Sequence, residues 1–243
     1  NMLLDSRVII HLSLFFLYFL QHHGIFGESN VTRGVHVSPP KPITEKYQSY
    51  CTIPCDGDKL HVMCQYLGRP ICSNYSVTLD KQDKDNILGL FNYYRTQLAI
   101  GKLFLNISAS NMQAMYWDDE LETMANTWVT QCEKELDECR NSIDGTYVSQ
   151  SKYYHVCIEK TCDNPIFSII QEVIRKTMNE SLSYKETLVK KYEQMVARDR
   201  YAMLLWAKTE KVGCSISKDE DEFTIVCNFK PGAGIHKKYT FRK

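Results

Sequence analysis

Hydrophobic side chains recur at helical spacing in the stretch 80–101. The repeat places four apolar side chains on one helical face: Ile87, Phe91, Tyr94 and Leu98. Intervals of three and four residues are typical of an amphipathic helix. Asp80 can cap its N-terminus and Gly101 can end it.

A second helical repeat occupies residues 117–132. Its apolar face holds Leu121, Met124, Ala125, Trp128, Val129 and Cys132. Asp119 and Glu122 have the spacing of a capping box, with Asp in place of Ser or Thr, so we expect the helix to begin at this pair.

Two further helices are predicted after residue 163. In the first, Asn164 can cap and Pro165 fits the first helical position. Its inward face holds Ile166, Ile169, Ile170, Val173 and Ile174. The second helix runs from about Lys185 through Met195 into the apolar stretch that follows.

Strand patterns appear near the C-terminus, at 211–217 and 223–229. The second alternates apolar side chains onto one face: Phe223, Ile225, Cys227 and Phe229. The charged turn Lys218–Glu222 joins the two strands as a hairpin, which brings Cys227 within reach of Cys214. Helices followed by a strand pair predict an α+β domain of helix, sheet and helix layers.

The N-terminal region differs from the rest. Arg7 precedes an apolar run at 8–20 that is too short and too interrupted for a spanning helix, so we interpret residues 1–27 as a secretory signal peptide rather than a membrane anchor. Residues 28–50 contain Pro39, Pro40 and Pro42 and are expected to form an extended leader.

Cysteine usage supports an oxidising compartment. All ten cysteines lie between Cys51 and Cys227, and an even number behind a signal peptide indicates disulfides. Zinc ligation is the less favoured alternative, because the chain contains no CxxC pair. Four cysteines within 51–72 predict a cross-linked lobe. Sequons for N-glycosylation occur at Asn30, Asn74, Asn106 and Asn179.

The net charge of the chain does not point to a particular class of binding partner. Lys plus Arg and Asp plus Glu both number 29, so no net field favours nucleic acid or an anionic membrane. The folded part from Cys51 onward has the size of one domain, and we expect a secreted monomer without a stable membrane anchor.

Several short motifs follow one another in a recognisable order. They are 61-HVMCQY-66, 92-NYYRTQLAIGK-102, 116-YWDDELETMANTWVTQC-132, 139-CRN-141, 204-LLWAKTEKVGC-214 and 225-IVCNFKPGAG-234. In this order the motifs resemble the CAP superfamily, and within it the venom allergen (antigen 5) branch of stinging and blood-feeding insects. The resemblance implies a CAP-type α-β-α sandwich over residues 81–243, preceded by a disulfide-rich N-terminal lobe at 51–80.

The resemblance also implies a disulfide pattern. The implied pairs are Cys51–Cys64, Cys55–Cys139, Cys72–Cys132 and Cys214–Cys227. This leaves Cys157 and Cys162 as an additional local pair, with two free thiols as the less favoured alternative in a secreted protein.

CAP proteins typically line a central cleft with two histidines and two acidic residues, and some bind a divalent metal there. The matching positions in this chain are Phe91, Gln150, Glu172 and Arg200. A single carboxylate beside a permanently charged arginine cannot hold a metal, so we expect no cofactor. Arg200 either pairs with Glu172 or points to solvent. Phe91 shares the apolar face of its helix and is expected in the core.

The resemblance implies a non-enzymatic effector from venom, saliva or haemolymph that binds an unknown extracellular protein target or a small hydrophobic ligand. Phe91 and the stretch Met203–Trp206 could line a lipid pocket, although a filled core is favoured. A metal-dependent redox or proteolytic CAP enzyme is the alternative, and the missing histidines count against it. His61, His155 and His236 are expected at the surface. A disulfide-rich inhibitor is a third hypothesis.

Overall fold

The computed structural model describes most of the chain from residue 45 to residue 233. The described ranges are 45–67, 69–71, 75–103, 108–157, 165–182, 200–219 and 221–233. All belong to one compact unit that spans Ile43–Lys243. The predicted signal peptide and the predicted helix from Lys185 through Met195 lie outside these ranges.

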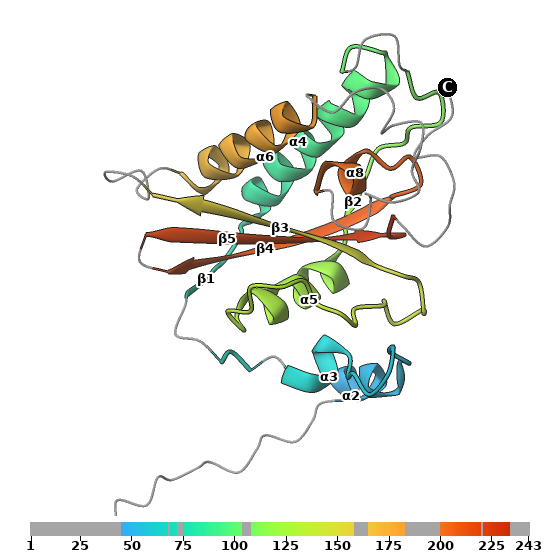
Figure 1. Ribbon diagram of the computed structural model, residues 1–243, viewed down its shortest axis with the longest axis vertical. Coiled ribbons are helices and arrows are strands. Elements are labelled where there is room, and N and C mark those ends of the chain that lie inside the picture. Colours follow the sequence, from blue (N-terminus) through green and yellow to red (C-terminus); the bar gives the residue numbers. More distant parts are fainter. Residues whose placement is uncertain are drawn as a thin grey trace, which may run out of the picture. The chain divides into compact units, whose positions relative to one another are not determined.

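A mostly antiparallel sheet forms the middle layer (Figure 1). Its strands are β1 (Tyr75–Val77), β2 (Tyr116–Trp117), β3 (Ser149–Val156), β4 (Lys211–Asp219) and β5 (Glu222–Lys230). Four strands follow the order β1-β4-β5-β3, and the short β2 pairs in parallel with β4.

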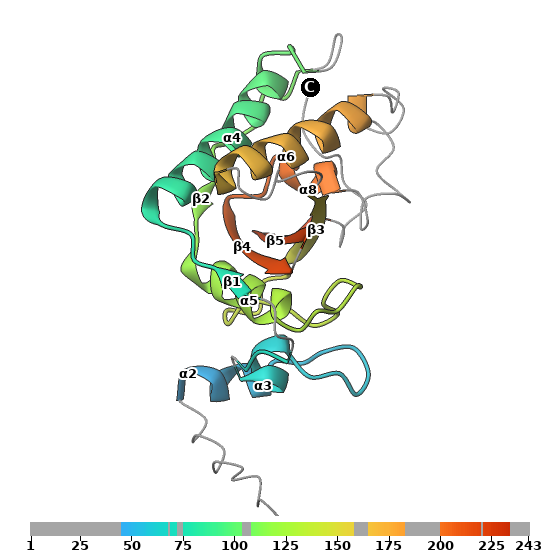
Figure 2. The same cartoon turned by 90° about the vertical axis from the view of Figure 1, so that its left-hand side faces the viewer.

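Helices cover both faces of this sheet. They are α2 (Glu45–Gln48), the 3-10 turn η1 (Ser49–Thr52), α3 (Val62–Tyr66), α4 (Lys81–Ala99), α5 (Asp119–Val129), α6 (Ile166–Leu182) and α8 (Arg200–Leu205). Figure 2 shows α4, α6 and α8 on one face and α5 on the other. The α-β-α sandwich implied by the family resemblance is therefore present.

The predicted hairpin is confirmed and is longer than expected. Strands β4 and β5 continue to Asp219 and Glu222, and Cys214 faces Cys227 in the register. A disulfide joins these two residues. The hairpin lies at the centre of the sheet, so this cross-link ties its two longest strands within the main core.

Local chemistry explains the bounds of α4. The Asp80 carboxylate accepts a hydrogen bond from the Asp83 backbone N–H (2.8 Å), and the Asp83 carboxylate accepts one from the Asp80 N–H (3.2 Å). This is a capping box made with two aspartates. Gly101 adopts a left-handed φ of 71° directly after the helix.

The predicted start of α5 is wrong by one residue. Asp118, not Asp119, is the N-cap, and its carboxylate accepts from the Leu121 N–H (3.1 Å). Glu122 does not complete a capping box. Its carboxylate instead accepts hydrogen bonds from Trp117 Nε1 (2.8 Å) and Lys84 Nζ (2.6 Å), which joins α5 to β2 and α4.

Close backbone approach also fixes α5 against β4. A Cβ added at Gly213 would stand 2.2 Å from the backbone nitrogen of Glu122, so only glycine fits there without displacing the helix. The N–H of Asp118 donates to the carbonyl of Val212 (2.9 Å) at the same junction.

The N-terminal lobe packs on the outer side of α5. Tyr50, Val62 and Met63 from the lobe share a hydrophobic cluster with Leu121 and Met124 of α5. Disulfides Cys51–Cys64 and Cys55–Cys139 cross-link the lobe, the second to the loop after α5. The cross-linked lobe predicted from the cysteine spacing is therefore present.

Candidate functional site

Of the four positions that correspond to the family cleft, the three whose side chains the structure describes do not meet in one place. Phe91 is fully buried where α4 packs on the sheet, and its ring centroid lies 6.0 Å from that of Phe229 in β5. Glu172 is exposed on α6. The structure does not describe the side chain of Arg200, so the predicted pairing of Arg200 with Glu172 stays a prediction.

Gln150 lies on the opposite face of the sheet from Phe91. Its Oε1 accepts a hydrogen bond from the Asp137 N–H (2.9 Å), and its Nε2 donates to Asn228 Oδ1 (3.0 Å). Asn228 in turn donates to the carbonyl of Leu121 in α5 (3.1 Å). Gln150 is thus a buried link between β3, β5 and the α5 layer, and the prediction that it lines the cleft with Phe91 is wrong.

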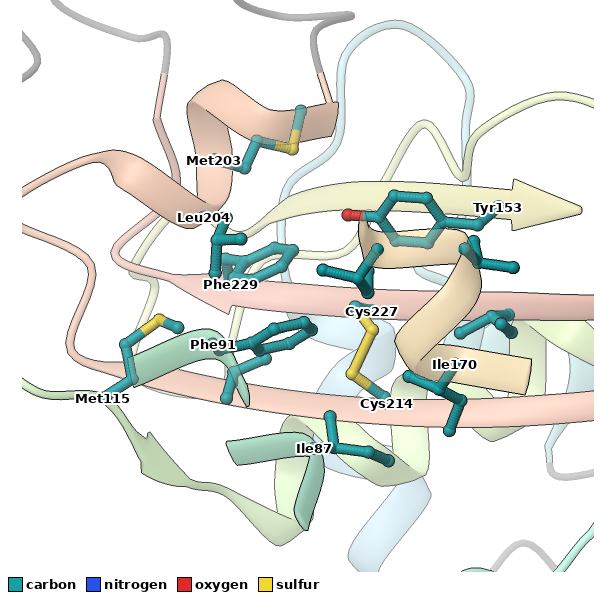
Figure 3. Close-up of a cluster of buried hydrophobic side chains, with 14 of the residues drawn as sticks. Ile87, Phe91, Met115, Tyr153, Ile170, Met203, Leu204, Cys214, Cys227 and Phe229 are labelled. Carbon is teal, nitrogen blue, oxygen red and sulfur yellow. A yellow bond between two sulfur atoms is a disulfide. The ribbon is translucent and has the colours of Figure 1, made fainter. Parts of the chain in front are cut away.

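Apolar side chains fill the space around Phe91. Figure 3 shows Phe91 facing Phe229, with Leu204 from α8 beside the pair. Met203 is also buried, and its sulfur accepts a hydrogen bond from Ser151 Oγ (3.2 Å). Together these side chains belong to one continuous core cluster, in which Phe91 contributes packing and no polar atom.

These residues do not fit a metal. Phe91 offers no ligand atom, and Gln150 points to the other face. Among the described residues, no group of three His, Cys, Asp or Glu side chains could hold a metal ion. Phe91 and Gln150, two of the four positions implied by the resemblance, are therefore buried parts of the fold in this chain.

A buried arginine organises the core beside Phe91. Arg95 is 1% exposed and contacts no carboxylate in the described part of the chain. It donates instead to backbone carbonyls, those of Gln113 (2.7 Å), Leu204 (2.8 Å), Trp206 (2.9 Å), Ala207 (3.4 Å) and Thr209 (2.9 Å). Burial lowers its pKa to about 10, so it remains charged at neutral pH.

Asn92 extends this network. Its side chain donates to the carbonyl of Met115 (3.0 Å) and accepts from the N–H of the same residue (2.8 Å). The Asn-x-x-Arg pattern of α4 thereby holds two segments against the helix: 113–115, and 204–209, which begins in the last turn of α8. Asn92 and Arg95 are both part of the sequence motif 92–102, but the sequence did not predict that their side chains donate hydrogen bonds to backbone carbonyls.

The prediction of a surface position for His61 is wrong. The side chain is 1% exposed and stacks on Tyr50. His61 Nδ1 accepts from the Met63 N–H (3.2 Å) and so caps α3, while Nε2 contacts the carbonyl of Asn141 (2.7 Å). A carbonyl can only accept, so the imidazole is neutral with its proton on Nε2. His155 is half-buried at the end of β3, and His236 lies outside the described residues.

Acidification is expected to destabilise the protein through His61. Burial lowers the pKa of His61 because it removes water from the charged form, and the Asn141 carbonyl and Glu120 oppose the shift only in part. A second proton would also occupy Nδ1 and abolish the cap of α3. The unfolded chain binds that proton near pH 6.5, so stability from His61 is present above pH 6.5 and is lost as the pH falls from there towards the lower folded pKa.

Denaturant unfolding at pH 8 and pH 5 measures this effect, with disulfides intact. The variant His61→Gln cannot titrate, and we expect its free energy of unfolding to depend less on pH than that of the wild type. Equal pH dependence in the two proteins would contradict the assignment.

Three of the implied disulfides are present, at Cys51–Cys64, Cys55–Cys139 and Cys214–Cys227. Cys132 and Cys157 are also disulfide-bonded. Their predicted partners, Cys72 and Cys162, lie outside the described residues. So do three of the sequons, whereas Asn179 is exposed on α6.

One feature bears on membranes. No helix in the described ranges is long and apolar enough to cross a bilayer.

Comparison with known proteins supplies the family. The profile of the cysteine-rich secretory protein family (CAP) matches residues 88–229, which lie within the predicted CAP domain. Venom allergen 5.01 of Dolichovespula maculata is 30% identical over 205 residues, covering 76% of this chain and 84% of the relative. Venom allergen 3 of Solenopsis invicta is 29% identical over 207 residues, covering 77% and 86%.

Solved structures show the same fold at lower identity. The structure of BmVAL-1 superposes with a TM-score of 0.56 at 21% identity, covering 68% of this chain and 84% of that chain. The crystal structure of NaASP2 with Zn2+ gives a TM-score of 0.56 at 16% identity, covering 68% and 87%. The family profile covers more than half of the chain and the fold agrees with these structures, so the chain belongs to the cysteine-rich secretory protein (CAP) family, with insect venom allergens among its relatives.

Proposed function

We propose that this protein is a secreted effector that acts by binding an extracellular protein target and not by catalysis. The observation that carries the proposal is the fully buried position of Phe91, packed on Phe229 where the family resemblance implies a metal-binding or catalytic histidine. An imidazole at this position would be the base or the ligand, and a phenyl ring can be neither.

Secretion is supported by the sequence and by the chemistry of the cysteines. The basic residue and apolar run at the N-terminus fit a signal peptide. The disulfides that cross-link the lobe and the central hairpin are typical of proteins that fold in an oxidising compartment. The insect relatives named venom allergens support the same assignment.

A protein target is favoured over a small hydrophobic ligand. The side chains that could have lined a lipid pocket, Phe91 and Met203–Trp206, are all between 0% and 9% exposed in a continuous core. Close-packed side chains leave no space for an acyl chain or a sterol. The surface, by contrast, presents exposed aromatic side chains such as Tyr93 and Tyr116, which are common in protein interfaces.

One preparation tests the proposal. The chain is secreted from insect cells, purified, dialysed against Zn2+ and Cu2+ in turn and desalted, and its metal content is measured. An organic extract of the same sample is analysed for lipid, and casein cleavage and superoxide disproportionation are assayed.

We expect only trace metal, no stoichiometric lipid and no activity that follows the protein through purification. Stoichiometric zinc or copper, or either activity, would overturn the non-enzymatic assignment. A stoichiometric lipid would replace the protein target by a hydrophobic ligand.

A further inference from the structure

The outward face of α4 carries no charge from the middle of the helix to its C-terminal end. Figure 2 shows this helix at the margin of its layer, with α6 beside it on one side. Within residues 88–101 the one charged side chain is Arg95, which is buried. Four exposed residues follow one another on the outward face at intervals of four, three and four positions, the spacing of a seam that packs against a second helix. These residues form the α4 seam: Gly89, Tyr93, Thr96 and Ile100.

The surface of the α4 seam is apolar and aromatic. Tyr93 is 56% exposed and Ile100 is 54% exposed. The ring of Tyr93 packs edge-on against that of Tyr94, which contacts the core, so its position is restrained. The Thr96 hydroxyl donates to the carbonyl of Asn92 (2.8 Å) and needs no outside partner. Contiguous exposed surface of this kind marks an interaction site.

Gly89 is not required by the fold of a single chain. Its φ is not positive, and a Cβ added there would meet no atom within 4 Å. Glycine in a helix interior is less favourable than alanine, and it suits positions that another molecule approaches closely. The open space above Gly89 can therefore receive a large side chain from outside.

The α4 seam is complementary to itself in one arrangement. When two copies of α4 run in opposite directions about a two-fold axis midway between Tyr93 and Thr96, Gly89 faces Ile100 of the second copy. In the same arrangement Tyr93 faces Thr96 of the second copy. Each large side chain then meets a small one, and each contact occurs twice, as in every two-fold interface. A parallel pair would instead oppose Tyr93 to Tyr93 and leave a gap at Gly89.

Charges at the two ends of the α4 seam suit the same arrangement. Exposed Asp85 lies four residues before Gly89, where its other partner is Lys81 in an exposed ion pair. Exposed Lys102 lies two residues after Ile100. In an antiparallel pair the end that carries Asp85 meets the end of the second copy that carries Lys102. Opposite charges at the rim of a neutral contact favour this direction over the parallel one.

We propose that the α4 seam is a self-association interface, on which a second copy of the chain docks its own α4 in the antiparallel direction. This differs from the monomer expected from the sequence. The interface concerns contact between two copies of the chain, so it does not rest on the proposed function.

Sedimentation velocity of the purified full chain, at concentrations from about 5 to about 500 µM, measures self-association. One helix pair is a small interface, so we expect a weak dimer with a Kd of roughly 10–100 µM. Ile100→Asp places a charge in the α4 seam and should raise the Kd by at least about tenfold. The matched control is Ile71→Asp in the N-terminal lobe, where the isoleucine is 70% exposed, and it should leave the Kd unchanged.

A pair of substitutions tests the direction of the two helices. Gly89→Glu and Ile100→Lys should each weaken the dimer. Combined in one chain, they should bind at least about threefold more tightly than either single variant, because the new carboxylate of one copy faces the new ammonium group of the other, twice. Within one chain the two positions are about three helical turns apart, too far to pair with each other.

Three results would overturn the interface. A wild-type chain that stays monomeric up to about 500 µM has no such contact. Equal Kd values for Ile100→Asp and Ile71→Asp would mean that the copies associate through another surface. A double variant that binds no more tightly than its single variants would contradict the antiparallel arrangement. All three measurements use the chain alone, so they stand or fall separately from the protein target.

Discussion

Replacing Arg95 by leucine is expected to lower the free energy of unfolding by roughly 4 kcal/mol, the cost typical of disrupting a buried charged network. The guanidinium donates to five backbone carbonyls, that of Gln113 before β2 and four in the stretch 204–209, which runs from the end of α8 towards β4. Leucine fills part of the volume but leaves these buried carbonyls without their donor, and each orphaned acceptor carries a desolvation cost.

The matched control is Arg175→Leu, at an exposed arginine on α6. A surface substitution of this kind is expected to change stability by less than about 0.5 kcal/mol. Guanidinium unfolding followed by circular dichroism, with disulfides intact, gives both values. If Arg95→Leu lost less than about 1 kcal/mol, the arginine would not be the structural centre of this region.

The same network limits what sequence reasoning could find. The helix 80–101 and the final hairpin were predictable because their determinants are local: Asp80 and Gly101 at the ends of α4, and strict alternation in β5. The sequence around Arg95 predicts a helix but does not distinguish a buried arginine from an exposed one. Its partners at Leu204 and Thr209 lie more than a hundred residues away, and only the tertiary structure brings them together.

The start of α5 was missed for a related reason. Both Asp118 and Asp119 can cap a helix, and the sequence does not choose between them. The choice comes from the parallel pairing of β2 with β4, which engages the Asp118 N–H with Val212 and places Asp118 at the strand–helix boundary.

Phe91 and Gln150, on opposite faces of the sheet, also differ in how far the sequence predicts their positions. Phe91 could be assigned to the core from its helical repeat alone. Gln150 could not be assigned to a face, because the first five residues of β3 are all buried and lack an apolar–polar alternation.

A second large effect is expected at Phe91 itself. Replacing it by alanine removes a ring that is 0% exposed, lies tilted beside the ring of Phe229 and belongs to the cluster formed by α4, α6, α8 and the sheet. Loss of a fully buried phenylalanine typically costs about 3–5 kcal/mol, from lost transfer free energy and from the cavity left behind. Tyr93→Ala is the matched control on the same helix, because Tyr93 is 56% exposed.

This comparison tests the central claim, which is that packed side chains and not an open reactive cleft occupy the family's site. The measurement is the difference in free energy of unfolding between Phe91→Ala and the wild type, determined by guanidinium denaturation at neutral pH. The filled core predicts a loss of at least about 3 kcal/mol, against less than about 1 kcal/mol for Tyr93→Ala. A loss at Phe91 no larger than that at Tyr93 would show that the ring borders open space, and would contradict the claim.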